Sequence, residues 1–329
     1  MTASMSRTYS SDRDLPGMID LLVSVRPVDR LTDYPGIADL RELLATPTVR
    51  ANTRLWLDDE DRTVAYALVD SYNNLHWELD PRGAAQGLES ELVAWGEVCV
   101  RRAIADDGLP RTLDAACRED DTERIALLER EGFLRQPIRS LRMARSLAEP
   151  IPLPHLPPGF RIRPVAGEHE AEPLVELHRT AFGTHSMTVE ERLAMMRVPE
   201  YDPELDLVAV APEGRLVAYC LCSICREEIE RTGRSEGSTD PIATHPDHRR
   251  RGLAKALLLT GLTRLKSRGI ETAVLGTSSE NAAMQRTAQA VGFHTRSTRL
   301  WFAKPVASPR HATDAGSVGS EDMDQAPAP

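Results

Sequence analysis

The sequence predicts a mixed α/β (α+β) protein built from two tandem copies of one fold, each with a mostly antiparallel central sheet flanked by helices. Three observations predict this fold class. Strand-like and helix-like stretches alternate through residues 159–304. A weaker version of the same pattern recurs at a nearly constant offset within residues 1–149. Between them, residues 150–158 contain five prolines, which exclude helix and central strand and predict an extended linker.

The length and charge of the chain narrow its class further. A chain of 329 residues can form two domains with separate cores. Its net charge of −10 argues against a nucleic-acid partner and against docking on an anionic membrane. Residues 1–14 contain no signal-peptide core, and no apolar run approaches a membrane span, so we expect a cytoplasmic protein. Residues 305–329 are rich in Ala, Ser, Gly, Pro and Asp and predict a disordered tail.

Three of the five cysteines, Cys220, Cys222 and Cys225, lie in one strand-like run. An odd number of cysteines without a signal peptide indicates reduced thiols. No second Cys or His pair follows at the spacing of a zinc site. We therefore interpret the three as buried strand thiols and expect no metal.

The elements of the second segment follow from its periodicity and its turn residues. Strands are expected over 159–165, 207–211, 216–225, in a run ending at 244, over 272–276, and in a final strand pair that ends near 302. Helices are expected over 168–182, 189–196, 250–268 and 279–291.

The first segment repeats glycines of the second. Gly132 precedes Gly292 by 160 residues, and Gly87 precedes Gly252 by 165 residues. We expect a loop within 103–110 to absorb the difference of five residues.

The most informative stretch is the loop Arg249–Ala254, which follows a strand and a Pro-Asp turn and opens a helix. Its backbone N–H groups and the positive end of the helix dipole would favour a phosphate or pyrophosphate. Gly252 lets the backbone approach such a ligand, and Ala254 keeps the first helical turn thin. From the loop alone, a solvated basic helix start stays an alternative.

Arg249-x-x-Gly252-x-Ala254 resembles the Arg/Gln-x-x-Gly-x-Gly/Ala signature of the GNAT superfamily of CoA-dependent N-acetyltransferases. Asn281, followed by Gly292-Phe293, is similar to the second motif of that family. The resemblance covers residues 159–304 and implies two tandem GNAT-like domains, with acetyl-CoA as the co-substrate.

The resemblance also implies roles for individual residues. In the family, the strand before the loop parts from the next strand and hydrogen-bonds the pantetheine arm, the loop holds the pyrophosphate, and the asparagine lies near the thioester. The residues that match are Ile242, Ala243 and Thr244 on the strand, Arg249, Arg250, Arg251, Gly252, Leu253 and Ala254 in the loop, and Asn281.

Acetyl transfer to an amine requires a base, because a free alkylamine has a pKa of roughly 10 and enters protonated. Asp240 lies two residues before Ile242 and is the first candidate, with a turn-capping aspartate as the alternative. Glu228 and Glu230 could act through water.

The sequence departs from the family at Ala288, where many members carry a tyrosine that protonates the leaving thiolate. A thiolate leaves readily, because its thiol has a pKa near roughly 8.5. Tyr219, Ser278 and water stay open as the acid.

The first copy lacks the cofactor residues. At the offset of 165, Arg249 becomes Ala84, Ala254 becomes Glu89 and Asp240 becomes Leu75; at the offset of 160, Asn281 becomes Asp121. A carboxylate beside a pyrophosphate would be unfavourable. We therefore interpret the first copy as a degenerate domain that shapes or covers the substrate site.

The combined prediction is an enzyme that moves an acetyl group from acetyl-CoA to a primary amine of a small molecule or peptide. A tandem pair with one active copy is also the architecture of the mycothiol synthase group, although no motif names the substrate. The alternatives are a CoA-binding module without turnover and a structural tandem scaffold. We expect a small-molecule amine as the partner, and a homodimeric assembly stays open.

Overall fold

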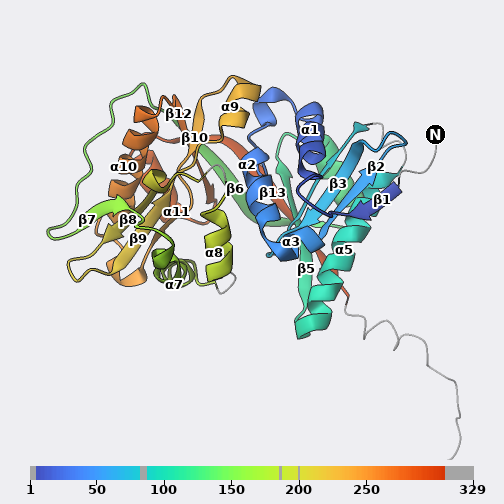
Figure 1. The fold of residues 1–329 in the computed structure, drawn as a ribbon, viewed down its shortest axis with the longest axis horizontal. Coiled ribbons are helices and arrows are strands. Elements are labelled where there is room, and N and C mark those ends of the chain that lie inside the picture. Colours follow the sequence, from blue (N-terminus) through green and yellow to red (C-terminus); the bar gives the residue numbers. More distant parts are fainter. Residues whose placement is uncertain (1–4, 82–86, 185–186, 199–200, 308–329) are drawn as a thin grey trace, which may run out of the picture.

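The computed structural model describes residues 5–81, 87–184, 187–198 and 201–307. Two lobes lie side by side, and a long central sheet joins them (Figure 1). The elements of the first segment are β1 Met5–Thr8, α1 Leu15–Val25, α2 Ile37–Ala45, α3 Pro47–Ala51, β2 Thr53–Leu57, β3 Thr63–Val69, β4 Leu75–Leu79, α5 Leu88–Asp107, β5 Arg111–Arg118, α6 Thr122–Arg130 and β6 Leu134–Ser146. Those of the second are β7 Arg161–Pro164, α7 Ala171–Phe182, α8 Val189–Met195, β8 Asp206–Val210, β9 Leu216–Leu221, α9 Arg226–Thr232, β10 Glu236–Ser238, β11 Ile242–Thr244, α10 Leu253–Ser267, β12 Thr272–Ser278, α11 Ala282–Gln289 and β13 His294–Val306.

Three sheets form the scaffold. The first lobe contains the sheet β1-β2-β3-β4, and the second contains β11-β9-β8-β7. The central sheet has the order β10-β12-β6-β13-β5 and takes strands from both segments. All strand pairs between the named strands are antiparallel except β10 with β12, so the predicted mixed, mostly antiparallel fold class is confirmed.

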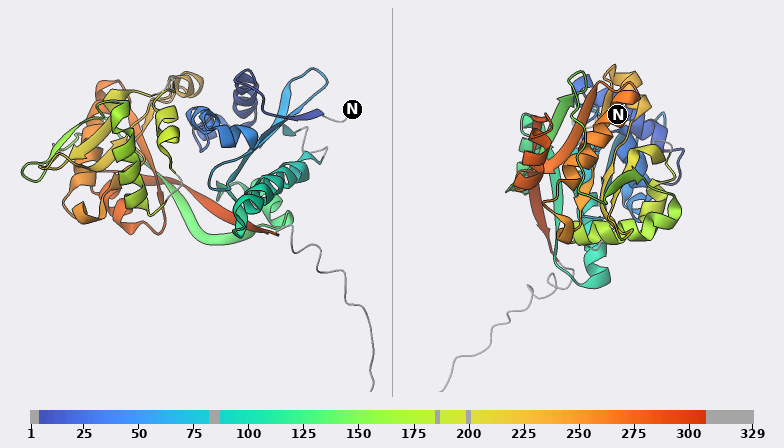
Figure 2. Two further views of the ribbon diagram at one scale, coloured as in Figure 1. Left: turned by 60° about the horizontal axis from the view of Figure 1, so that its bottom comes forward. Right: turned by 90° about the vertical axis from the view of Figure 1, so that its left-hand side faces the viewer.

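The lobes exchange their last strands. β6, from the first segment, pairs with β12 of the second, and β13 pairs with β5 of the first. Figure 2 shows the two strands running together from one lobe into the other. Met143 and Leu147 thereby enter the core of the second lobe, and Leu300 and Phe302 enter that of the first.

The exchange corrects one sequence-based expectation. The predicted strand pair near residue 302 is a single strand of 13 residues, β13, and its partners come from the first segment. Local periodicity cannot reveal this arrangement, because strand partners are set by tertiary contacts. β13 extends to Val306, so the predicted tail begins inside it, and residues 308–329 lie outside the described residues.

The internal repeat is visible in the geometry. Asn74 forms a parallel bridge with Asp114, and Thr239 donates its N–H to Val274 O over 2.9 Å at the equivalent place in the second lobe. The difference in offset falls within residues 103–110, as expected, but in a helix and not in a loop: helix α5 has 20 residues and ends at Asp107, whereas α10 has 15.

Residues 150–158 form neither helix nor strand. The bounds of the two domains on either side of them stay a prediction, since the central sheet runs across the division. No helix in the described part of the chain combines the length and apolarity that a membrane span requires.

Candidate active site

Two neighbouring strands part at Asp240. β10 pairs with β12 in parallel, and this pairing ends at Ser238 opposite Val274. β11 begins at Ile242 and pairs with β9 in a different sheet. Asp240 therefore lies at the point where the chain leaves one sheet for the other, and in the described structure no strand covers the other edge of β11.

The open edge of β11 carries unused peptide groups. Leu221 N–H donates to Pro241 O over 3.1 Å, and His245 N–H donates to Val217 O over 2.8 Å. Because peptide groups alternate in direction along an antiparallel strand, those of Ile242 and Thr244 point away from β9. The Oγ1 of Thr244 is buried and has no hydrogen-bond partner among the described residues. This edge can pair with an extended ligand chain as another strand would.

The loop Arg249–Ala254 forms the start of α10. Arg250 and Gly252 have positive φ values of 63° and 79°, and Gly252 is the N-cap residue. Within the described structure no side chain caps the helix, and its first turn contains no acidic residue. The N–H groups at the helix start are therefore available to an anion, and the helix dipole favours one.

The side chains of this loop have different roles. Arg249 ties the loop to α7, because its Nη2 donates to Ala181 O over 2.8 Å. Leu253 is buried in the core of the second lobe, and Arg250 and Arg251 are exposed. The loop thus offers backbone N–H groups from a fixed position, surrounded by exposed arginines.

The first copy has the same loop geometry without the same chemistry. Gly87 has a φ of 80° and is the N-cap of α5, as Gly252 is of α10. Glu89 and Glu91 lie in the first turn, and Glu89 pairs with Arg130. Carboxylates there would repel a phosphate. Ala84, the counterpart of Arg249, lies outside the described residues.

Asn281 caps a helix. Its Oδ1 accepts the N–H of Met284 over 3.0 Å at the start of α11. Asp121 does the same for Arg124 N at the start of α6, over 3.1 Å. Both copies therefore keep a cap at this position. The cofactor contact that the family resemblance implies would have to use the Nδ2 group.

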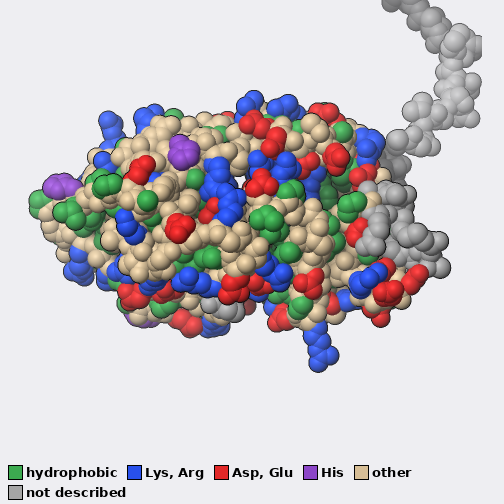
Figure 3. Space-filling view, turned by 90° about the horizontal axis from the view of Figure 1, so that it is seen from above, with side chains coloured by type: hydrophobic (Ala, Val, Ile, Leu, Met, Phe, Trp, Pro, Cys, Tyr) green, Lys and Arg blue, Asp and Glu red, His purple; other side chains and the backbone are tan. Residues whose placement is uncertain are grey.

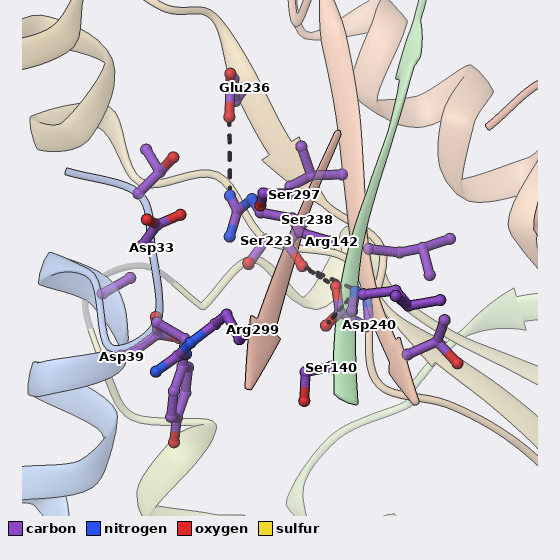
Figure 4. Close-up of a pocket in the computed structure, with 18 of the residues that line it drawn as sticks. Asp33, Asp39, Ser140, Arg142, Ser223, Glu236, Ser238, Asp240, Ser297 and Arg299 are labelled. Carbon is purple, nitrogen blue, oxygen red and sulfur yellow. Dashed lines mark hydrogen bonds and ion pairs between the residues drawn. The ribbon is translucent and has the colours of Figure 1, made fainter. Parts of the chain in front are cut away.

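A cavity of about 400 Å³ lies between the lobes, over the central sheet. Its wall from the second segment includes Glu228, Glu236, Ser238, Asp240 and Gly276, and its wall from the first includes Asp33, Tyr34, Asp39, His76 and Arg142. Figure 4 shows Asp240 beside Ser238 at one side of this cavity, and Asp33 and Asp39 at the other.

Asp240 is held in place by two hydrogen bonds. Ser238 Oγ donates to its Oδ1 over 2.5 Å, and Gly276 N–H donates to its Oδ2 over 3.2 Å. Burial raises the pKa of Asp240 above the ordinary aspartate value, and the charge of Asp39 adds to the rise. A carboxylate with a raised pKa is a stronger base, as proton removal from an ammonium requires.

The cavity has an excess of carboxylates. In the described structure Asp39, Glu228 and Asp240 form no ion pair with Lys or Arg, whereas Glu236 pairs with Arg296 over 2.6 Å. Burial raises the pKa of Glu228 to about 7, and Asp39 contributes. Figure 3 shows acidic and basic side chains interspersed over one outer face of the molecule, so acidity is not general there. The cavity therefore favours a cationic ligand.

Glu228 is also tied to the first lobe. Its Oε1 accepts the N–H of Ile37 over 2.6 Å at the start of α2. Glu230, the other candidate for a base acting through water, is exposed and does not line the cavity.

Tyr219 and Ser278, the two side chains that the sequence left open as the acid, do not line the cavity. Tyr219 is buried under α7, where its hydroxyl and His178 Nδ1 are 2.7 Å apart. Ser278 Oγ accepts the N–H of Glu280 over 3.0 Å. Ala288 is fully buried in the core of the second lobe. The tyrosine that does line the cavity is Tyr34, from the first lobe.

Sequence reasoning missed every cavity residue from the first segment. Tyr34, Asp39, His76 and Arg142 belong to no recognisable motif, and only the strand exchange and the docking of α2 bring them to Asp240. The five cysteines are buried, as expected for Cys220, Cys222 and Cys225. The expectation that all three lie in a strand is wrong: Cys220 is in β9, which ends at Leu221, and Cys225 is the N-cap residue of α9. Within the described residues, no group of three His, Cys, Asp or Glu side chains could hold a metal ion.

The chain forms two lobes of one fold. In the second lobe, a helix start without a side-chain cap among the described residues lies beside two strands that part. These features define a tandem acetyltransferase architecture. The GCN5-related N-acetyltransferase from Sphaerobacter thermophilus has this fold, with a TM-score of 0.66, 23% identity and coverage of 92% of this chain and 95% of that chain. A tandem GNAT protein from the clavulanic acid biosynthesis pathway gives a TM-score of 0.64 at 17% identity, over 92% of this chain and 98% of that chain.

Sequence comparison leads to the same group. The acetyltransferase (GNAT) family matches residues 171–293. The mycothiol acetyltransferase of Actinosynnema mirum is 30% identical over 233 residues, which cover 69% of this chain and 73% of that protein. That of Thermobispora bispora is 31% identical over 167 residues, and the match spans 56% of its length and 49% of this chain. The chain belongs to the GNAT family of acetyltransferases, in its tandem, two-domain form.

Proposed function

We propose that this protein transfers an acetyl group from acetyl-CoA to a primary amine, on a small molecule or a peptide, in the cavity between the lobes. The observation that carries the proposal is the position of Asp240. It lies between the open edge of β11 and the acidic cavity, at the place where β10 and β11 part.

The residues present suit acetyl-CoA as the co-substrate. The uncapped start of α10 can accept the pyrophosphate on the N–H groups of residues 250–254. The open edge of β11 can accept the amide groups of the pantetheine arm. Thr244 lies on that strand, and its Oγ1 has no hydrogen-bond partner among the described residues. An arm along this edge would run toward Asp240.

The chemistry follows from this placement. The amine enters as an ammonium, which Asp39, Glu228 and Asp240 attract. Asp240, directly or through one water, takes a proton from the nitrogen. The nitrogen then forms a bond to the thioester carbonyl carbon and the C–S bond breaks. The CoA thiolate leaves with the electron pair, and the second proton that the nitrogen gives up balances the proton that the thiolate takes up.

The acidic lining supports a substrate class. Among the described residues, Asp39, Glu228 and Asp240 have no basic partner in this partly closed cavity. Such a lining favours acceptors that are cationic before they react, such as aminosugars, polyamines or amino-terminal peptides. Because the curated relatives are named mycothiol acetyltransferases, a mycothiol precursor belongs among the acceptors to test.

The competing function is a CoA-binding module without turnover, which the buried Ala288 motivates. Release of free CoA from acetyl-CoA, measured with a panel of amines, separates the two. Turnover that depends on an amine supports the transferase. Tight acetyl-CoA binding with no CoA released by any amine would favour the module. The cytoplasmic location and a homodimeric assembly stay predictions.

A further inference from the structure

Arg299 lies where two cavities meet. It is on β13, and it lines both the cavity that contains Asp240 and a second cavity of about 340 Å³ in the first lobe. The two cavities also share Asp33, Tyr34 and Ala116. The two cavities are therefore adjacent at Arg299.

Arg299 differs from the other arginines around it. Six arginines line the two cavities, and five form ion pairs with carboxylates: Arg26 with Glu78 at 2.6 Å, Arg124 with Glu78 at 2.5 Å, Arg30 with Asp121 at 3.3 Å, Arg118 with Asp120 at 2.9 Å and Arg142 with Glu236 at 3.8 Å. Arg299 forms no ion pair with any described residue.

Most N–H groups of the Arg299 guanidinium form no hydrogen bond with the described residues. Its Nη2 donates to Ala116 O over 3.0 Å, and a guanidinium has five N–H groups. Burial lowers the pKa of Arg299 to about 10, because loss of solvent disfavours the charged form of the guanidinium. The charge of Asp33 acts in the opposite sense, but Asp33 is 3.6 Å from Arg118, which competes for it. A half-buried cation whose guanidinium makes one hydrogen bond to the described residues is satisfied best by an anionic ligand.

The sheet register fixes how far this group lies from Asp240. Gly276, which binds Asp240, is opposite Arg142 on β6, and Arg142 is opposite Ser297 on β13. Arg299 lies two residues beyond Ser297 on the same face. Two strand spacings and two residues place the Cα atoms of Gly276 and Arg299 about 12 Å apart. Figure 4 shows Arg299 and Asp240 well separated across the cavity.

We propose that Arg299 binds an anionic group of the acceptor, a carboxylate or a phosphate, while the amine of the same molecule lies at Asp240. This inference rests on the proposed acetyl transfer to an amine. It narrows the acceptor to an amine that carries a negative group several bonds away. Arg26 and Arg124, in the second cavity, add positive potential on the far side of Arg299.

The test uses pairs of acceptors that differ in the anionic group. One pair is glucosamine and glucosamine 6-phosphate, and a series compares ω-amino carboxylates with alkylamines of equal length. We expect a KM about tenfold lower for the anionic member, in the phosphate pair or in the carboxylate series, since hydrogen bonds to charged groups contribute about 1.5–3 kcal/mol. Arg299→Gln should raise that KM by about 10- to 100-fold and leave the KM of the neutral partner within about twofold.

Two variants act as controls. Arg139→Gln removes an exposed arginine of β6 that is outside both cavities, and should change neither KM. Arg299→Lys keeps the charge but loses the fork of donors, and should give an intermediate KM for the anionic acceptor. Calorimetric titration of the anionic probes, without acetyl-CoA, should show weaker binding by Arg299→Gln.

The outcomes separate this inference from the proposed function. Turnover of amines with equal KM values for both members of every pair, or an equal loss for both in Arg299→Gln, would overturn the role of Arg299 and keep the transferase. No turnover with any amine, together with anion binding that Arg299→Gln abolishes, would overturn the transferase and support the anion site.

Discussion

Gly276 donates its backbone N–H to Oδ2 of Asp240 over 3.2 Å, across the place where β10 and β11 part. A Cβ on Gly276 would lie 3.2 Å from the same oxygen, so the absence of a side chain lets the carboxylate approach the strand. The contact holds Asp240 toward β12 while the chain leaves for β11. The candidate base is thus fixed by the feature that opens the gap for the co-substrate.

Gly252→Ala should weaken acetyl-CoA binding. Gly252 has a φ of 79° with open space around its Cβ position, so alanine would meet no clash. It would, however, strain the left-handed backbone by about 1–2 kcal/mol or shift the loop. We expect a several-fold higher Kd for acetyl-CoA, measured by calorimetry.

Gly214→Ala is the matched control for this prediction. Gly214 has a φ of 89°, also with open space, in the turn between β8 and β9. It should lose similar stability and keep the wild-type Kd. Equal Kd values for both variants would show that the α10 loop does not bind the co-substrate.

Substitutions of Asn281 should separate capping from cofactor contact. Asn281→Ala removes the bond to Met284 N and should destabilise the fold by about 1 kcal/mol in thermal or urea unfolding. Asn281→Asp keeps a cap of the kind that Asp121 provides in the first copy, and should keep stability. Because aspartate lacks the Nδ2 donor, the KM for acetyl-CoA should rise in Asn281→Asp. An unchanged KM would leave Asn281 as a cap alone.

The contribution of Glu228 to stability should fall as pH rises from about 4.5 to about 7. Burial raises the folded-state pKa of Glu228 to about 7, against a usual value near 4.5. Over that range the folded state binds more protons than the unfolded state, so the free energy of unfolding decreases with pH. Glu42, whose pKa burial also raises to about 7, acts in the same direction.

Glu228→Gln tests the assignment. It keeps an acceptor for Ile37 N and removes the charge. The decrease in the free energy of unfolding, measured by urea titration at each pH, should become smaller in this variant. A wild-type slope in Glu228→Gln would contradict a buried, raised carboxyl at this position.

The two halves of the chain should not fold independently. A fragment of residues 150–307 lacks β6, which lies between β12 and β13, and lacks Met143 and Leu147 of its core. We expect no cooperative thermal transition by circular dichroism for this fragment alone. Mixing it with residues 1–149 should restore the transition. A cooperative transition and native acetyl-CoA affinity in the isolated fragment would contradict the strand exchange.

The sequence predicted what depends on local pattern. The turn of Gly252, the helix after it and the repeat of Gly87 at its offset follow from backbone conformation, which nearby residues determine. The pairing of β6 with β12 depends on contacts between residues more than 120 positions apart. The hydrophobic periodicity of the sequence does not indicate which distant strands pair. Asp240 was identified because it neighbours a motif. Arg299 was not identified. Its candidate role follows from a contrast that appears only in the structure: the neighbouring arginines form ion pairs, whereas Arg299 forms none with the described residues.

Asp240→Asn provides the most direct test of Asp240 as the base in acetyl transfer. The measurement is the rate of CoA release from acetyl-CoA with a saturating primary amine, from pH 5 to 9, with Glu230→Gln as an exposed control. For the wild type, kcat should fall as pH decreases through a pKa that burial raises above the ordinary aspartate value, because Asp240 must be ionised to accept the proton. Asp240→Asn should lower kcat by about 10²- to 10⁴-fold and remove this dependence, while acetyl-CoA binding is kept. A variant with wild-type kcat and an unchanged pH profile would contradict the assignment of Asp240 as the base.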